Sequence, residues 1–362
     1  MMSGALPTPP APPLRTRNVV LMMVDGVRWQ EVFRGADPRL LAGVPEADVP
    51  EAGMPGEDEQ EQVRRAFGGV TPAARREALL PFLWSVVARQ GTVLGNHDLG
   101  SRCAVTNGRN LSYPGYSETL CGFVGPAIVD NEHGPNPNVT VFEWLARQPD
   151  WRRGEIGVFG AWDGIGEVFH EGRAPFAVNV GYDPLTEGRT TSGIALLNRL
   201  KAELPRGWAD EPYDPLTFRT ALEWIAANGP RLTFLGLGEP DEWAHHGDYG
   251  RYLQSTRRWD AAVGELWAIL QLLPQYRDTT TLILTCDHGR GDGPRWTDHG
   301  TDTPGSEATW LAFLGPDTPA AGEAADEQAT NDGIAATIAR LLGYDYCAAE
   351  PRAGAPIDAA FG

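Results

Sequence analysis

The sequence predicts an α/β fold with a mostly parallel sheet and helices on both of its faces. Continuous apolar, β-prone runs recur along the chain, as expected of strands that are buried on both faces of a sheet. Between them lie segments with apolar residues at three- and four-residue steps, which is the pattern of amphipathic helices. The alternation of the two patterns favours helix layers above and below one sheet.

The expected elements follow in order along the chain. The first strand is NVVLMMV, and the strands are predicted at 18–24, 156–160, 176–180, 231–237, 280–286 and 309–315. Helices are predicted at 73–90, 217–228, 251–273 and 332–343. The helix at 251–273 has the clearest apolar face, with Trp259, Val263 and Leu266 in register, and Gly343 is the expected C-cap of the last helix.

The chain is predicted to form one domain, residues 17–362, behind a flexible tail. Residues 1–16 are rich in proline and lack periodicity, which is the composition of a tail. Residues 46–62 carry seven carboxylates and no basic residue, so we expect an acidic, solvated surface insertion there.

Charge and cysteine content restrict the partners and the compartment. With 30 Lys and Arg against 48 Asp and Glu, the formal net charge of −18 argues against binding to nucleic-acid polymers or to an anionic membrane face. The 4 cysteines show no metal-binding or disulfide-scaffold spacing, which fits a reduced compartment and leaves one or two bridges open. No signal-like or membrane-length apolar run is present, so we expect a soluble cytoplasmic protein, or a periplasmic or secreted one if a signal was trimmed.

Three carboxylates follow predicted strands. Asp25 comes after 18–24, Asp241 comes shortly after 231–237, and Asp287 comes directly after 280–286. Ligands of open parallel sheets bind at the carboxyl ends of the strands, so these side chains are expected to converge there.

Histidines accompany two of these carboxylates. Asp241 and His245 have the i, i+4 spacing that places both on one face of a helical turn, and His288 is adjacent to Asp287. His299 follows in a second Asp-His-Gly triplet, eleven residues after the first, in a chain with only 7 histidines. Mixed Asp and His donors suit Zn²⁺ or a similar divalent ion and are typical of catalytic metal sites.

The expected nucleophile lies in NLSYPGYSETLCGF. Pro114 and Gly115 are interpreted as a turn, so that Ser117 begins a short helix, where backbone N–H groups favour anions. Thr119 and Ser112 are weaker candidates because neither begins that predicted helix. The alternative for Ser117 is a plain helix N-cap.

The motifs MVDG, SYPGYSE, EPDEWAHH, CDHGRG and DHG, in this order over most of residues 18–345, resemble the alkaline phosphatase superfamily. They are closest to its nucleotide pyrophosphatase/phosphodiesterase-like and bacterial "alkaline phosphatase family" branches. The resemblance implies a three-layer α/β/α sandwich and two divalent metal ions, most commonly Zn²⁺, with Mn²⁺ as the alternative. It implies one metal held by Asp241, His245 and His299 and another held by Asp25, Ser117, Asp287 and His288.

The activity implied by the resemblance is hydrolysis of a small-molecule phosphate ester through a phosphoserine intermediate. The sequence differs from the family pattern in two places. A gapless alignment with the phosphodiesterase pattern puts the family's Thr opposite Glu118, and no arginine lies between Arg109 and Arg147. The second departure argues against a dedicated phosphomonoesterase and favours diesters or activated esters.

Further residues are candidates for substrate binding. Asn107, Asn110 and Arg290 have side chains that could donate to a phosphoryl oxygen, with turn formation or solvation as the alternative. Two other functions stay open: a phosphotransferase or mutase that uses the same metals, and a metal-binding pseudoenzyme. The sequence leaves the oligomeric state open.

Overall fold

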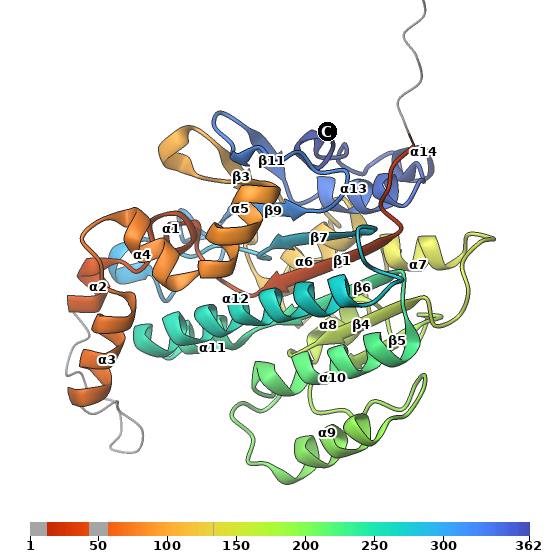
Figure 1. Cartoon of the computed structure of the whole chain (residues 1–362), viewed down its shortest axis with the longest axis horizontal. Coiled ribbons are helices and arrows are strands. Elements are labelled where there is room, and N and C mark those ends of the chain that lie inside the picture. Colours follow the sequence, from red (N-terminus) through yellow and green to blue (C-terminus); the bar gives the residue numbers. More distant parts are fainter. Residues whose placement is uncertain (1–12, 43–56, 133) are drawn as a thin grey trace, which may run out of the picture.

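A computed structural model of the chain describes residues 13–42, 57–132 and 134–362. Its centre is an eight-stranded sheet with the order β10-β2-β9-β7-β1-β6-β4-β5, beside a small sheet with the order β11-β3-β8 (Figure 1). The strands are β1 (Asn18–Val24), β2 (Thr92–Leu94), β3 (Arg102–Ala104), β4 (Ile156–Gly160), β5 (Ala177–Val180), β6 (Leu232–Leu237), β7 (Thr280–Thr285), β8 (Ala308–Thr309), β9 (Leu311–Leu314), β10 (Gly322–Glu323) and β11 (Gln328–Thr330).

The large sheet is mostly parallel, which confirms the predicted fold class. β1 pairs in parallel with β6 and with β7, and β4 pairs in parallel with β5 and with β6. Only β9 runs against its neighbours β2 and β7 in this sheet. β1 therefore lies in the interior of the sheet, and its carboxyl end is flanked by those of β6 and β7.

Helices cover both faces of this sheet. They are α1 (Trp29–Arg34), α2 (Pro38–Ala42), α3 (Glu57–Phe67), α4 (Pro72–Leu79), α5 (Ala88–Gln90), α6 (Ser112–Cys121), α7 (Val141–Ala146), α8 (Gly164–Val168), α9 (Ser192–Glu203), α10 (Asp214–Asn228), α11 (Glu239–His245), α12 (Tyr249–Leu272), α13 (Gly333–Leu341) and α14 (Tyr346–Ala349). In Figure 1, α10 and α12 lie in front of the sheet and α6 lies behind it.

The two faces of β1 belong to two apolar cores. Val20, Met22 and Val24 pack in a cluster with residues of α10 and α12, among other elements. Val19, Leu21 and Met23 pack in a second cluster with residues of α6, α7 and α13. Alternate residues of a strand point to opposite faces, so a run that is apolar throughout is what a strand between two helix layers requires.

Four local predictions need correction. The helix predicted at 73–90 is divided into α4, a π-helical turn at Leu83–Val87 and α5, with Pro81 at the break. The strand predicted at 309–315 is divided at Trp310 between β8 and β9, which belong to different sheets. Residues 57–62 of the predicted acidic loop begin helix α3, while 46–56 lie outside the described residues.

The fourth correction concerns the tail, whose residues 1–12 also lie outside the described part. The backbone N–H groups of Arg15 and Thr16 donate to the Asp317 carboxylate at 2.8 Å and 2.7 Å, and Thr16 is buried. The packed part of the chain therefore begins before residue 17.

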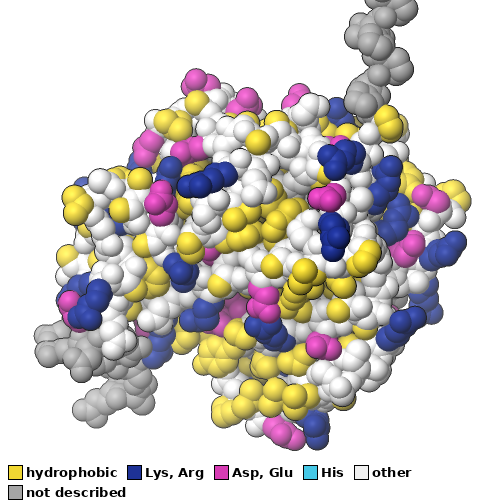
Figure 2. Space-filling view, in the orientation of Figure 1, with side chains coloured by type: hydrophobic (Ala, Val, Ile, Leu, Met, Phe, Trp, Pro, Cys, Tyr) yellow, Lys and Arg dark blue, Asp and Glu magenta, His cyan; other side chains and the backbone are white. Residues whose placement is uncertain are grey.

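Within the described residues, no helix is long and apolar enough to cross a membrane. Figure 2 shows one face of the molecule, on which acidic and basic side chains are scattered among apolar and polar ones. The excess of carboxylates therefore does not form a single-sign patch on this face.

Candidate metal centre and active site

Three buried carboxylates meet at the carboxyl edge of the sheet. Asp25 follows β1, Asp287 follows β7 closely, and Asp241 lies in the first turn of α11, just after β6. The N–H of Gly26 donates to Oδ1 of Asp287 at 3.2 Å, which joins the ends of β1 and β7. The convergence predicted from the sequence is therefore present in the structure.

His288 lies at the centre of these carboxylates. Its Nε2 is 3.3 Å from Asp25 Oδ1, 3.4 Å from Asp287 Oδ2 and 3.9 Å from Asp241 Oδ1. Its Nδ1 is 2.9 Å from the carbonyl oxygen of Gly289, which can only accept a hydrogen bond, so Nδ1 carries the hydrogen. Burial and the neighbouring His299 hold the pKa of His288 well below its ordinary value. The ring is therefore neutral, with the Nε2 lone pair directed at the carboxylates.

His299 and His245 complete the cluster. Nδ1 of His299 is 2.9 Å from the carbonyl oxygen of Asn110 and therefore carries the hydrogen. Its Nε2 then has the lone pair that could bind a metal ion. That Nε2 is 3.1 Å from Nε2 of His245, which is 2.8 Å from Asp241 Oδ2. The rings of His288 and His299 stack with centroids 4.0 Å apart.

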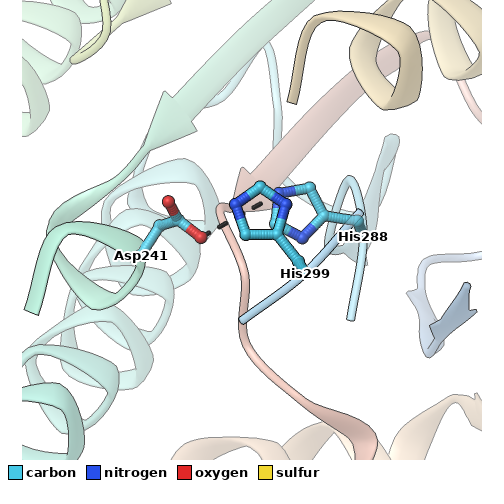
Figure 3. A group of neighbouring side chains, drawn as sticks. All are labelled: Asp241, His288 and His299. Carbon is cyan, nitrogen blue, oxygen red and sulfur yellow. Dashed lines mark ion pairs between the residues drawn. The ribbon is translucent and has the colours of Figure 1, made fainter. Parts of the chain in front are cut away.

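The cluster contains two sets of donors that could each hold a metal ion. Asp241, His288 and His299 form one set (Figure 3), and Asp25, Asp287 and His288 form the other. Within each set the donor atoms lie within 4.8 Å of one another. His245 extends the first set through its contacts with Asp241 and His299.

The buried carboxylates of the cluster would be stabilised by a cation. Burial and the charges of Asp287 and Asp241 raise the pKa of Asp25, and burial with the charge of Asp241 raises the pKa of Asp287 to about 8. Asp25 Oδ1 and Asp287 Oδ2 are buried and have no hydrogen-bond partner among the described residues. Buried carboxylates without donors are costly unless a cation pairs with them, so these residues fit divalent metal ions.

Comparisons with known proteins identify the fold. No family model and no curated protein matches the sequence. Among solved structures, wild-type alkaline phosphatase PafA matches at a TM-score of 0.58 and 11% identity, over 98% of this chain and 100% of that one. The lipoteichoic acid synthase LtaP from Listeria monocytogenes matches at a TM-score of 0.56 and 11% identity, over 91% of this chain and 72% of that one.

A third match is the phosphonate monoester hydrolase of Agrobacterium radiobacter, at a TM-score of 0.52 and 13% identity, over 91% of this chain and 74% of that one. The chain has the alkaline phosphatase-like fold. The resemblance inferred from the order of the motifs is thus confirmed at the level of the fold.

Within this alkaline phosphatase-like fold, Ser117 does not reach the cluster. Its side chain is 1% exposed, and its hydroxyl accepts a hydrogen bond from Asn136 Nδ2 at 3.1 Å and lies 4.0 Å from Cys121 Sγ. Thr119, the alternative, is also buried and accepts from Asn331 Nδ2 at 3.2 Å. The predicted role of Ser117 as metal ligand and nucleophile does not fit this position.

Ser112 occupies the place expected of Ser117. It is the first residue of α6, and its Oγ is 3.4 Å from Nε2 of His288. The helix begins earlier than predicted, because Pro114 lies within its first turn and not in a turn before it. Proline is compatible with the first turn of a helix, where its missing N–H would have no intrahelical partner, and that signal could have identified Ser112.

The residues predicted to bind substrate mainly support the cluster. Arg290 is fully buried, pairs with the Asp241 carboxylate and donates to the carbonyl oxygen of Thr297. Although burial raises the pKa of Asp241, the Arg290 guanidinium and the neighbouring histidines bring it well below its ordinary value.

Asn107 and Asn110 also have partners within the protein. The Asn107 amide donates to Glu118 Oε2 at 2.7 Å, and its carbonyl oxygen accepts from the N–H of Arg109 at 2.8 Å. Asn110 donates to Ser306 Oγ at 3.0 Å, and its backbone carbonyl orients His299. Both asparagines therefore hold the loop between β3 and α6 in place.

A pocket of about 720 Å³ opens from the cluster. Asp25, Ser112, Asp241 and His245 line it at the cluster, and Ser117 is not among its lining residues. No Lys or Arg is among the described residues that line it. The Ser112 hydroxyl and the candidate metal ligands therefore face the same pocket.

Proposed function

We propose that this chain is a metal-dependent hydrolase of phosphate esters, with Ser112 as its nucleophile. The observation that carries the proposal is the position of Ser112 Oγ, at the start of a helix, in the pocket and 3.4 Å from the nitrogen shared by both donor sets. The solved structures with the same fold include proteins named as an alkaline phosphatase and a phosphonate monoester hydrolase.

The donor sets support the division of ligands that the resemblance implies. In this proposal Asp241, His245 and His299 would hold one ion, and Asp25, Asp287 and His288 the other, with Ser112 beside His288. Two such ions, most commonly Zn²⁺, lower the pKa of a coordinated hydroxyl and neutralise charge on a phosphoryl group.

The protein's own groups prepare Ser112 for attack. The helix dipole of α6 favours negative charge on the Ser112 oxygen, because the N–H groups at a helix start point toward it. The Ser112 oxygen forms a bond to phosphorus while the bond from phosphorus to the leaving alcohol breaks. Water then cleaves the phosphoserine, releasing phosphate or a phosphate monoester and restoring the serine hydroxyl.

The pocket favours esters with little negative charge. Because no Lys or Arg is among its described lining residues, a dianionic monoester finds no protein cation there beyond the candidate metal sites. This supports diesters or activated esters as substrates.

The test measures metal content by mass spectrometry and hydrolysis of bis-p-nitrophenyl phosphate and p-nitrophenyl phosphate. We expect divalent metal in the wild type, loss of turnover on chelation and recovery when Zn²⁺ is restored. Ser112→Ala should lower kcat by about a thousandfold or more with its metal largely retained, as loss of a covalent nucleophile does.

Ser117→Ala is the matched control, since it removes the same hydroxyl from the same helix away from the cluster. It should change kcat by less than about threefold, because it touches neither pocket nor donors. A large loss with Ser117→Ala and none with Ser112→Ala would reverse the assignment. Metal-loaded wild type without turnover of either ester would indicate a metal-binding pseudoenzyme.

A further inference from the structure

Carboxylates that are not candidate metal ligands also line the pocket and come from several segments. Six of them are called its acidic half: Asp163, Glu167, Asp183, Asp210, Glu211 and Glu242. Burial and the charges of Asp210 and Glu167 raise the pKa of Asp163. None of the six forms a salt bridge with a described Lys or Arg, and the neighbouring Lys201 contacts the backbone oxygen of Asp183 and not its carboxylate.

Glu211 provides an independent indication that a ligand is bound here. The residue is 4% exposed, and its Oε1 has no hydrogen-bond partner among the described residues. Gly238 leaves room for this carboxylate, since a Cβ there would lie 2.2 Å from Glu211 Oε1. A buried acceptor without a donor is costly, so a ligand that supplies a cationic or N–H group would stabilise this carboxylate.

An aromatic ring lies beside these carboxylates. Trp162 lines the pocket, and its Nε1–H donates to Asp210 Oδ2 at 3.2 Å, which fixes both the ring and the carboxylate. The face of an indole attracts ammonium groups, and its effect adds to that of neighbouring carboxylates.

The carboxylates are too dispersed to hold one metal ion. Within the described residues, the groups of three or more donors that converge closely enough for an ion lie at the catalytic cluster, and neither contains any of these six residues. Charges spread along a pocket suit an organic cation with its own length.

We infer that the substrate is a phosphate ester of an amino alcohol, whose ammonium group binds between Glu211, Asp163, Asp210 and Trp162. This inference rests on the proposed function, since the phosphoryl group must lie at Ser112. The acidic half then sets specificity: it attracts the ammonium end and repels esters with a second anionic group.

The test compares two diesters in the metal-loaded wild type. One is p-nitrophenyl phosphorylcholine, and the other is its isostere with an uncharged head group, in which a tert-butyl group replaces the trimethylammonium group. The kcat/KM of the choline ester should exceed that of the isostere by roughly tenfold or more, as expected for a hydrogen-bonding or ionic contact to a buried charge. The ethanolamine ester distinguishes primary from quaternary ammonium.

Glu211→Gln should bring the ratio of the two kcat/KM values close to one, because it keeps the shape of the side chain and removes its charge. Glu203→Gln is the matched control, since Glu203 is an exposed carboxylate at the end of α9, outside the pocket. It should leave the ratio unchanged.

Calorimetric binding of choline separates this inference from the proposed function. Choline that binds wild type and binds Glu211→Gln at least about tenfold more weakly supports an ammonium site even without turnover. Equal hydrolysis of both esters, with no binding of choline or ethanolamine, overturns the inference while the hydrolase proposal stands. Choline binding without Ser112-dependent hydrolysis of any ester overturns the proposed function alone.

Discussion

At the scale of single residues, Gly26 allows the Asp241 carboxylate to lie close to the end of β1 and to the other candidate metal ligands. Its φ is +61°, and a Cβ there would lie 2.2 Å from Asp241 Oδ1 and 2.8 Å from Arg290 Nε. Glycine therefore permits both the turn after β1 and the close approach of the Asp241 carboxylate.

Gly26→Ala should weaken metal binding by at least about tenfold, as changes beside metal ligands do, because the new methyl group displaces Asp241. Metal content after dialysis against a weak chelator measures this. Gly343→Ala is the control: Gly343 also has a positive φ of +88°, but a Cβ there meets nothing within 4 Å. It should cost only about 1–2 kcal/mol of stability from backbone strain and retain its metal.

The candidate metal ligands could be predicted from the sequence, but the proposed nucleophile, Ser112, was only a weaker candidate there. Asp25, Asp241 and Asp287 follow apolar strands, so the topology of a parallel sheet was enough to bring them together. Ser112 and Ser117 lie on the same short helix, and choosing between them requires knowing where that helix begins. Pro114 is compatible with a helix start just before it, and the structure settles where the helix begins, because α6 starts at Ser112.

At the scale of elements, the approach of α6 to the end of β7 places Ser112. Gly115 makes this approach possible, since a Cβ there would lie 2.3 Å from the backbone oxygen of Asp287 and 3.3 Å from its Cβ. A backbone atom cannot move aside as a side chain can.

Gly115→Ala should therefore shift α6 and lower kcat by about a hundredfold, since displacements near 1 Å are that costly at reacting groups. Steady-state kinetics and thermal unfolding on the same preparations test this. Gly250→Ala, at the start of α12, is the control because its nearest contact would be Val63 Cγ2 at an ordinary 3.4 Å. An unchanged kcat in Gly115→Ala would show that the position of α6 does not matter for the reaction.

Helix α9 carries a buried cation whose pKa gives a pH-dependent stability. Lys201 is 2% exposed, its Nζ donates to Asn179 Oδ1 at 3.0 Å, and burial lowers its pKa to about 8. Between pH 8 and pH 10.4, the approximate unfolded value, the unfolded chain binds a proton that the folded chain does not. Stability from this group therefore rises with pH across that window.

The free energy of unfolding of wild type, relative to Lys201→Met, should accordingly increase by about 3 kcal/mol from pH 7 to pH 10.5. Urea unfolding of both proteins at several pH values measures this difference in the free energy of unfolding. Contributions from the titration of tyrosines and cysteines are the same in both proteins and cancel. A difference that is constant with pH would mean that Lys201 is solvated in the folded protein.

The longer strands of the large sheet and the helices α10, α12 and α13 could be predicted at this scale, but short elements such as β2, β3 and β11 were missed. The errors within the predicted elements have physical causes. Apolar periodicity continues across Pro81 and Trp310, so both segments appeared to be single elements. Proline breaks the helical hydrogen bonding, and Trp310 is where the chain passes from the small sheet to the large one.

At the scale of the whole molecule, the net charge of −18 opposes the approach of anionic esters. Salt screens this repulsion, because the Debye length shortens from about 30 Å at 0.01 M to about 8 Å at 0.15 M. The sequence predicts this property fully, since composition alone determines it.

The kcat/KM for dianionic p-nitrophenyl phosphate should therefore rise by roughly twofold or more over that range of salt. Zwitterionic p-nitrophenyl phosphorylcholine has no net charge and should show little change. A fall for the dianion would mean that local attraction by the metal centre outweighs the field of the whole chain.

The position of β1 also affects how the protein is made. β1 is synthesised before its partners β6 and β7, which begin at Leu232 and Thr280, more than 200 residues after Asn18. At typical rates of synthesis, its two apolar faces stay without both neighbours for roughly ten to fifty seconds. His299 is synthesised later still, so all the candidate metal donors are present only after residue 299 has been made. A metal ion could bind the complete cluster only from that point on, and until then the apolar faces of β1 are a site for aggregation.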